Sequence, residues 1–152
     1  MRVELATSKI IPAWIGLARE VEPLFEGSMA KDEGFHEFMK RKIKRAEAFM
    51  IREGRHSNEL MGIMAISHNN NAISWFAVHE KYRGRGIGSR ILERALKDLD
   101  HTKEISVTTF REDNVEGLPA RRIYLKYGFI DFDTNALHDG HPRCVMKLLP
   151  II

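Results

Sequence analysis

The hydrophobic pattern changes its period across one glycine-rich turn, and this change restricts the fold more than any other feature of the sequence. Residues 71–79, with the letters NAISWFAVH, are typical of a β-strand. From residue 87 onward the apolar side chains recur at helical spacing, at Ile87, Ile91, Leu92, Ala95 and Leu96. A strand that leads through a short turn into an amphipathic helix favours a layered domain over a helix bundle or a barrel.

The other segments alternate between the same two patterns. Strand patterns cover residues 2–7, 48–53, 60–67, 104–110, 129–134 and 143–149. Helical patterns cover residues 13–25, 32–46 and 118–127. The polar turn GRHSN predicts a hairpin between the second and third strands. The resulting order, β-α-α-β-β-β-α-β-α-β-β, predicts an α/β fold in the sense of an α+β layered domain.

Length and charge limit the domain count and the partners. The chain of 152 residues has no internal repeat and no flexible linker, so we expect a single domain over residues 1–152. Its 24 basic residues are interleaved with 21 acidic ones, a bias too mild to indicate nucleic-acid binding. The densest basic run, residues 40–45, is interpreted as the solvated face of a helix, with steering of an anionic ligand as the alternative. The run lacks interleaved aromatic residues, so a nucleic-acid partner is not expected.

No segment has the pattern of a membrane span or a secretion signal. The longest apolar run, LMGIMAI, is too short to cross a bilayer, and the first residues, MRVELATSKIIPAW, contain no long apolar core. Cys144 is the only cysteine, so no internal disulfide can form, which agrees with a reducing compartment. We therefore expect a cytoplasmic protein that does not bind a membrane and is a monomer or a homodimer.

The turn RGRGIG has the physical properties of a phosphate site. The start of a helix leaves backbone N–H groups without acceptors and carries a partial positive charge. Gly84, Gly86 and Gly88 carry no side chain that would keep an anion away from these groups, and Arg83 and Arg85 add positive charge. A tight strand-to-helix turn without any ligand is the alternative interpretation.

Two common phosphate motifs do not match this turn. A P-loop requires the string G-x-x-x-x-G-K followed by Ser or Thr, which the sequence lacks. A dinucleotide fingerprint requires a third glycine at the position of Ser89. The phosphate ligand is therefore expected to belong to another class.

The same residues resemble motif A of the GNAT superfamily, the acyl-CoA-dependent N-acyltransferases. That motif is Arg or Gln, two residues, Gly, one residue, and Gly or Ala, and its positions are occupied by Arg83, Gly86 and Gly88. The stretch ARRIYLKYGFIDFD is similar to motif B of the family, with matches at Ala120, Tyr124, Gly128 and Phe129. The two motifs follow each other in the family's order. The resemblance implies a GNAT-like mixed, mostly antiparallel central sheet of about seven strands with about four helices.

The resemblance also implies which residues bind acetyl-CoA, the acyl donor. In such enzymes the motif A turn holds the pyrophosphate through its amides, here those of Arg83, Gly84, Arg85, Gly86, Ile87, Gly88 and Ser89. The strand before it binds the pantetheine arm, here through Phe76, Ala77 and Val78. A bulge in that strand commonly directs one N–H to the thioester carbonyl, where it acts like an oxyanion hole.

Tyr124 matches the tyrosine that protonates the departing thiolate in this family. A phenol with a pKa near 10 is able to donate a proton to a thiolate of similar basicity. Periodicity alone also allows a simpler role, because Tyr124 shares one helical face with Ala120, Ile123 and Tyr127. Core packing is therefore the alternative interpretation of this residue.

The sequence departs from the family pattern before motif B. Many members place an asparagine seven residues before the tyrosine, where this chain has Gly117, while Asn114 lies three residues earlier. Either Asn114 reaches CoA from a longer loop or the contact is absent. The central strand also lacks a clear carboxylate for the general base, so Glu26, Ser74, Thr108 and an ordered water remain as routes for the proton of the amine.

The acceptor pocket of this fold is usually built from the segment between the first two helices and from the last hairpin. Here these are residues 24–29, which include Glu26, and residues 134–143, which include His138 and His141. The two histidines have an H-x-x-H spacing but no third candidate ligand, so no metal site is expected. They are interpreted as solvent-exposed, with contact to the acceptor substrate as the alternative.

These expectations combine into one leading hypothesis. The protein is predicted to be an enzyme that transfers an acetyl group from acetyl-CoA to a primary amine of a small molecule, peptide or protein, by direct attack in a ternary complex. The alternative is a non-catalytic acyl-CoA-binding regulatory module that has kept motif A. Turnover of an amine would distinguish the two.

Overall fold

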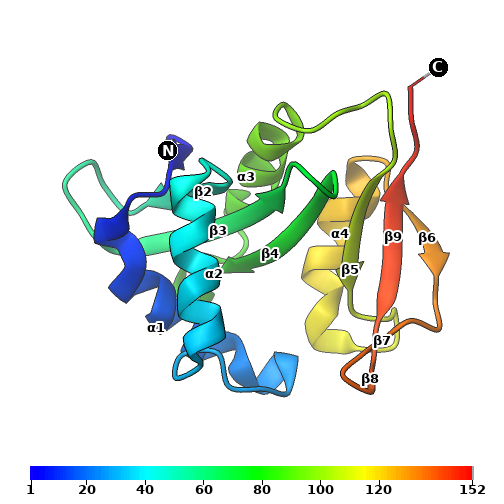
Figure 1. The fold of residues 1–152 in the computed structure, drawn as a ribbon, viewed down its shortest axis with the longest axis horizontal. Coiled ribbons are helices and arrows are strands. Elements are labelled where there is room, and N and C mark those ends of the chain that lie inside the picture. Colours follow the sequence, from blue (N-terminus) through cyan, green and yellow to red (C-terminus); the bar gives the residue numbers. More distant parts are fainter. Residues whose placement is uncertain (152) are drawn as a thin grey trace. The chain divides into compact units, whose positions relative to one another are not determined.

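The computed structural model describes residues 1–151, which fold into four α-helices and nine β-strands (Figure 1). The helices are α1 (Ile11–Phe25), α2 (Glu33–Lys44), α3 (Ile87–Leu96) and α4 (Leu118–Lys126). The strands are β1 (Glu4–Leu5), β2 (Ala48–Arg52), β3 (Leu60–Ser67), β4 (Ala72–Val78), β5 (Ile105–Thr109), β6 (Ile130–Asp133), β7 (Leu137–His138), β8 (His141–Pro142) and β9 (Cys144–Leu148). Short 3-10 turns are η1 (Ser8–Ile10), η2 (Glu80–Tyr82) and η3 (Val115–Gly117). Within this described part, no helix combines the length and the apolar character that a bilayer span requires.

Seven of the strands form one sheet, in the order β1-β2-β3-β4-β5-β9-β6. The pairs β1–β2, β2–β3, β5–β9 and β6–β9 are antiparallel, and β4 pairs with β5 in parallel. A mostly antiparallel sheet of seven strands with four helices confirms the predicted fold class.

The short hairpin of β7 and β8 was not predicted from the sequence. Its strands have two residues each and form a separate sheet, with the pairs Leu137↔Pro142 and His138↔His141. Asp139 and Gly140 form the turn with positive φ angles of 51° and 82°. Asp-Gly is a preferred pair for a two-residue hairpin turn, because that turn requires positive φ at both positions.

The chain divides into two compact units, and the first comprises residues 1–66 and 75–97. In this unit α1 and α2 pack against one face of β2, β3 and β4, which Ile63 also faces. Helix α3 lies on the opposite face, since neighbouring strand residues point in opposite directions and Gly62 meets Ile87 there (Figure 1). A Cβ at Gly62 would lie 3.0 Å from Cγ2 of Ile87, so the glycine lets α3 approach the sheet closely.

The second unit comprises residues 67–74 and the chain from residue 98 onward. Strand β9 pairs with β5 on one side and with β6 on the other. Helix α4 packs against this part through Tyr124, whose ring centroid lies 5.6 Å from that of Phe129. Motif B therefore contributes a buried aromatic pair to the second unit.

The basic run at residues 40–45 is not uniformly solvated. Lys42 is only 4% exposed, and its Nζ donates to the carbonyl of Ile66 at 2.5 Å and to Oε1 of Glu47 at 3.4 Å. Glu47 is itself 3% exposed. Burial lowers the pKa of Lys42, and the neighbouring Glu47 opposes that shift. The prediction of a solvated helix face is therefore wrong for Lys42.

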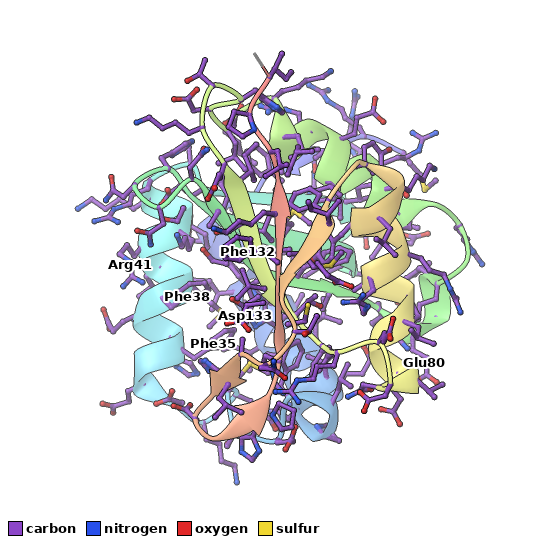
Figure 2. All side chains as sticks on the ribbon, turned by 90° about the vertical axis from the view of Figure 1, so that its right-hand side faces the viewer. Phe35, Phe38, Arg41, Glu80, Phe132 and Asp133 are labelled. Carbon is purple, nitrogen blue, oxygen red and sulfur yellow. The ribbon has the colours of Figure 1, made fainter. Side chains whose placement is uncertain are left out.

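The other cations of this run lie on the outer side of α2. Lys40 pairs with Glu37 at 3.8 Å, and the Cζ of Arg41 lies 5.6 Å from the ring centroid of Phe38. Figure 2 shows Arg41 and Phe38 along α2. Within residues 1–151, Arg41 and Lys44 have no carboxylate at ion-pair distance, so this side of α2 carries uncompensated positive charge.

Candidate functional site

The turn between β4 and α3 leaves the start of a helix without a side-chain cap. Gly86 is the N-cap residue, and no side chain accepts a hydrogen bond there. Helical hydrogen bonding begins with the N–H of Arg90, which donates to the carbonyl of Gly86 at 3.1 Å. The N–H groups at the first positions of α3, residues 87–89, thus have no acceptor within the helix. These groups and the helix dipole together form a site for an anion.

Two glycines of this turn have a conformation that other residues rarely adopt. Gly84 has a φ of 80° and Gly86 a φ of 75°. A Cβ at either position would meet no other atom within 4 Å, so their Cα atoms face open space. Backbone amides next to such glycines are accessible to a large anion such as a pyrophosphate.

The two arginines of the turn are held in place by neighbours. Nε of Arg83 donates to the carbonyl of Val78 at 3.3 Å, and the Cζ of Arg85 lies 5.5 Å from the ring centroid of Tyr82. The N–H of Arg83 is already used, because it donates to the carbonyl of Glu80 at 3.3 Å. The amides available to an anion therefore begin at Gly84, one residue later than the sequence predicts.

The side chains of the strand before the turn differ in how deeply they are buried. Ala77 is 7% exposed and belongs to the core under α1 and α2, whereas Phe76 and Val78 are half-buried. The parallel ladder of β4 with β5 consists of Ala72↔Ser106 and Ile73↔Val107. Residues 76–78 thus lie beyond the last pair of this ladder, so its hydrogen bonds do not involve them.

Tyr124 lies on α4 in the second unit and is 2% exposed. Burial alone raises its pKa far above the ordinary value of 10.0. The phenol therefore stays protonated at every pH at which an acetyl transfer is normally measured. It is a hydrogen-bond donor, and its ionised form is strongly disfavoured.

The burial of Tyr124 predicts a pH dependence of stability. In the unfolded chain the phenol ionises near pH 10.0, whereas in the fold it stays protonated to higher pH. Above that pH the unfolded state binds fewer protons, so the free energy of unfolding falls as the pH rises. We expect a smaller fall in Tyr124→Phe, measured by urea denaturation between about pH 9 and about pH 11. Equal slopes in both proteins would show that Tyr124 ionises normally in the fold.

The loop before α4 explains the departure from the family pattern at Gly117. A Cβ at this position would lie 2.5 Å from Cβ of Phe110, so a larger residue would displace the Phe110 side chain. Asn114 caps the η3 turn, since its Oδ1 accepts the N–H of Gly117 at 3.1 Å. The Nδ2 of Asn114 makes no hydrogen bond within residues 1–151, so it is available to a ligand.

The residues predicted for the acceptor side and for the general base are mostly exposed. Ser74 and Thr108 are exposed on β4 and β5, and Glu26 ends α1 in the left-handed conformation with a φ of 60°. His138 is exposed and lies 3.5 Å from the Asp139 carboxylate. The structure thus does not single out a general base among these residues.

His141 is opposite His138 in the β7–β8 hairpin. Across residues 1–151, no group of three His, Cys, Asp or Glu side chains gathers in a way that could hold a metal ion.

A pocket of about 300 Å³ in the second unit was missed by the sequence analysis. It is lined by Arg111, Glu112, Asp113, Arg121, Asp131, Thr134 and Cys144. Arg121 is 4% exposed, and its Nη2 donates to both carboxylate oxygens of Asp131 at 2.9 and 3.0 Å. None of the predicted site residues lines this pocket, although Arg121 and Asp131 lie within the stretch that resembles motif B.

The family follows from a comparison of the sequence with family models. A model described as the acetyltransferase (GNAT) domain matches residues 21–150. The chain belongs to the GNAT acetyltransferase family. This membership confirms the resemblance to the GNAT superfamily and the predicted enzyme class, that of an acyl-CoA-dependent N-acetyltransferase. No functionally curated protein matches the sequence.

Solved structures of GNAT acetyltransferases share the fold. A GNAT acetyltransferase from Bacillus cereus has a TM-score of 0.71 at 17% identity, over 99% of this chain and 98% of its own. Ard1 from Thermoplasma volcanium has a TM-score of 0.71 at 19% identity, over 99% and 98%. A chain in the NatC complex bound to Gag peptide and CoA has a TM-score of 0.68 at 18% identity, over 100% of both chains. The GNAT fold binds acetyl-CoA, and the uncapped start of α3 in this chain fits its pyrophosphate.

Proposed function

We propose that this GNAT acetyltransferase moves the acetyl group of acetyl-CoA to a primary amine by direct attack, with both substrates bound at once. The observation that carries the proposal is the uncapped, glycine-lined and positively charged start of α3 directly after β4. An anion-binding helix start of this kind suits a nucleotide pyrophosphate, because several N–H groups converge on the same open space.

Residues of the first unit bind the donor. The amides of residues 84–89 hold the pyrophosphate of CoA, and the charge of Arg83 and Arg85 strengthens this contact. The backbone of residues 76–78 binds the pantetheine arm, since it lies beyond the β4–β5 ladder. The thioester of CoA supplies the activated acyl group. The amide group of Asn114, in the second unit, is our candidate for the family's asparagine contact.

Tyr124 supplies a proton to the leaving sulfur. As the amine nitrogen forms its bond to the carbonyl carbon, the C–S bond breaks and the sulfur takes up negative charge. Tyr124 is protonated in the fold, so it donates a hydrogen bond and then its proton to the sulfur as charge develops there, although burial raises its pKa and so makes it a weaker acid than a free phenol. A proton from solvent then restores the phenol. The proton that the amine releases goes to water, because no carboxylate stands out as a general base.

The acceptor is a primary amine, and a screen of amines would identify the class of molecule that carries it. Several structural neighbours bear names of protein acetyltransferases, among them the NatC complex bound to Gag peptide and a ribosomal-protein-alanine N-acetyltransferase. Peptide α-amines therefore belong in a panel with polyamines, aminoglycosides and simple amines. Release of the CoA thiol with any of them supports the proposal. Binding of acetyl-CoA without turnover of any amine would instead support an acyl-CoA-binding module.

The replacement Gly86→Val is expected to abolish the stabilisation by acetyl-CoA. A ligand at a hundredfold excess over its Kd stabilises the native state by about 2.7 kcal/mol. The valine side chain would project into the open space that the pyrophosphate needs, and it would also disfavour the φ of 75°. Thermal unfolding with and without acetyl-CoA measures the effect, each variant being compared with its own ligand-free form.

Gly54→Val serves as the control for this measurement. A Cβ at Gly54 also meets no atom within 4 Å, but the residue lies in the loop between β2 and β3. This variant should keep the full rise in melting temperature. A folded Gly86→Val protein with an unchanged rise would place the CoA site elsewhere.

The positive charge on the outer side of α2 is expected to change the rate at which acetyl-CoA binds, and not the rate of acetyl transfer. Replacing Lys40, Arg41 and Lys44 by glutamine removes exposed charge, so the association rate of acetyl-CoA should depend less on salt. Turnover at saturating substrates should not change. Stopped-flow binding at several salt concentrations measures this, with a control variant that loses the same charge at Lys9, Lys97 and Lys103. A lower kcat in the folded α2 variant would place these residues in the active site.

A further inference from the structure

The pocket of the second unit lies where β5 and β6 end. Residues 111–113 follow β5, Thr134 follows β6, and Cys144 begins β9. Both β5 and β6 are antiparallel to β9, so their carboxyl ends meet at the same edge of the sheet. The volume of about 300 Å³ is at the lower end of the range for ligand pockets, so it suits a small molecule.

The buried part of the pocket is a fixed ion pair. Arg121 is 4% exposed and donates from Nη2 to both oxygens of Asp131, and its Nη1 donates to the carbonyl of Phe110 at 3.2 Å. The thiol of Cys144 donates to Oδ1 of Asp131 at 3.2 Å, and burial raises the pKa of this thiol, which therefore stays neutral. The charges of Arg121 and Asp131 thus compensate each other.

Arg111 is held in place but has no ionic partner. Its Nε donates to the carbonyl of Arg143 at 3.0 Å, and its Nη2 donates to the carbonyl of Ala136 at 3.1 Å. The side chain is half-buried, and among residues 1–151 no carboxylate lies at ion-pair distance from it and no acceptor faces its Nη1. A fixed guanidinium with unused N–H groups is suited to bind a carboxylate.

The other lining residues supply the opposite charge. Glu112 and Asp113 are exposed, and in the part of the chain that the structure describes they make no hydrogen bond or ion pair. The hydroxyl of Thr134 is likewise unused there. A simple anion would be repelled by the two carboxylates, and a simple cation would be repelled by Arg111. A small molecule that carries both charges close together would match both.

We propose that this pocket binds a free α-amino acid, with its carboxylate on Nη1 of Arg111 and its ammonium group on Glu112 and Asp113. The hydroxyl of Thr134 donates a further hydrogen bond to the bound carboxylate. Tyr124, our candidate proton donor, does not line the pocket. The amino acid is therefore a second ligand and not the amine that is acetylated, and its binding requires neither acetyl-CoA nor turnover.

Binding is tested by NMR titration of the full chain with each of the standard amino acids. At least one of them should shift the amide signals of Arg111, Thr134 and Cys144 in a saturable way. For the amino acid that binds most tightly, the α-amide lacks the carboxylate and the α-hydroxy acid lacks the ammonium group. Each analogue should bind about tenfold or more weakly. No saturable shift with any amino acid, or equal affinity for either analogue, would overturn the proposal.

The ammonium contact is tested in the variant Glu112→Gln combined with Asp113→Asn. Both side chains are exposed, so the fold should be kept, and the affinity for the amino acid should fall about tenfold or more. Glu37→Gln combined with Glu116→Gln removes the same charge from exposed positions outside the pocket and should bind like the wild type. Equal affinities of the two variants would overturn the assigned contact.

A last measurement tests whether the amino acid is a second ligand or the acceptor. With acetyl-CoA present, the bound amino acid should be recovered unchanged. If the wild-type protein converts it to the N-acetyl derivative and the Glu112→Gln, Asp113→Asn variant does not, the pocket holds the acceptor and its assignment to a second ligand is overturned.

Discussion

Replacing Tyr124 by phenylalanine is expected to slow acetyl transfer in a single turnover by about 100-fold or more, the usual scale for one positioned proton donor. Phenylalanine keeps the ring that packs against Phe129, so only the hydroxyl is lost. Without it, the departing sulfur takes its proton from water, which is a weaker and less well-placed donor. The affinity for acetyl-CoA should change little, because the pyrophosphate contacts lie in another part of the chain.

Single-turnover mixing is the appropriate measurement for Tyr124→Phe, because slow product release would hide the effect in a steady-state rate. Tyr127→Phe is a matched control, since it removes a hydroxyl from the C-cap residue of α4, three residues later, and should leave the rate close to that of the wild type. A wild-type rate in Tyr124→Phe would show that Tyr124 serves only in core packing, and it would leave water as the proton donor.

The replacement Lys42→Met should lower the free energy of unfolding by about 3–5 kcal/mol, the range observed when one partner of a buried ion pair is removed. Without the lysine, the Glu47 carboxylate stays in the interior without its cation, and the carbonyl of Ile66 loses a short hydrogen bond. Urea denaturation measures the change. Lys44→Met removes an exposed lysine from the same helix and should have little effect on stability.

A second replacement separates the cost of removing the lysine partner of Glu47 from the loss of packing. Lys42→Met combined with Glu47→Leu removes both charges, and it should recover much of the stability because neither charge of the pair stays in the interior. If Lys42→Met alone unfolds with the same free energy as Lys44→Met, the Lys42–Glu47 pair does not contribute to stability.

The period of the apolar residues predicted the helices and the long strands well, because each of these elements buries one face. The same hydrophobic period also indicated that Lys42 is buried. This lysine follows Met39 by three residues and Phe35 by seven, so helical spacing places it on the buried face of α2. Its positive charge favoured the solvated interpretation. The partner that makes burial tolerable, Glu47, is reached only after the chain reverses at Ala46, with a φ of 55°.

Other parts of the structure depend on contacts that no local pattern records. The carboxylate of Glu22 accepts the amides of Met29 and Ala30, seven and eight residues away, and Trp75 donates to the sulfur of Met29, 46 residues away along the chain. Gly117 is required by the position of Phe110, which follows from tertiary packing alone. Motif A was easier to predict, because strand, turn and helix follow one another directly in the sequence.

The burial of Cys144 makes the enzyme convenient to assay. Its side chain is 1% exposed, its Sγ donates to Oδ1 of Asp131 at 3.2 Å, and burial raises the pKa of the thiol. A chromogenic disulfide reagent attacks thiolates, so it should react slowly with the only cysteine of the chain and quickly with free CoA. The colour that develops during turnover would then report released CoA continuously, with no background from the native protein and no need to replace its cysteine.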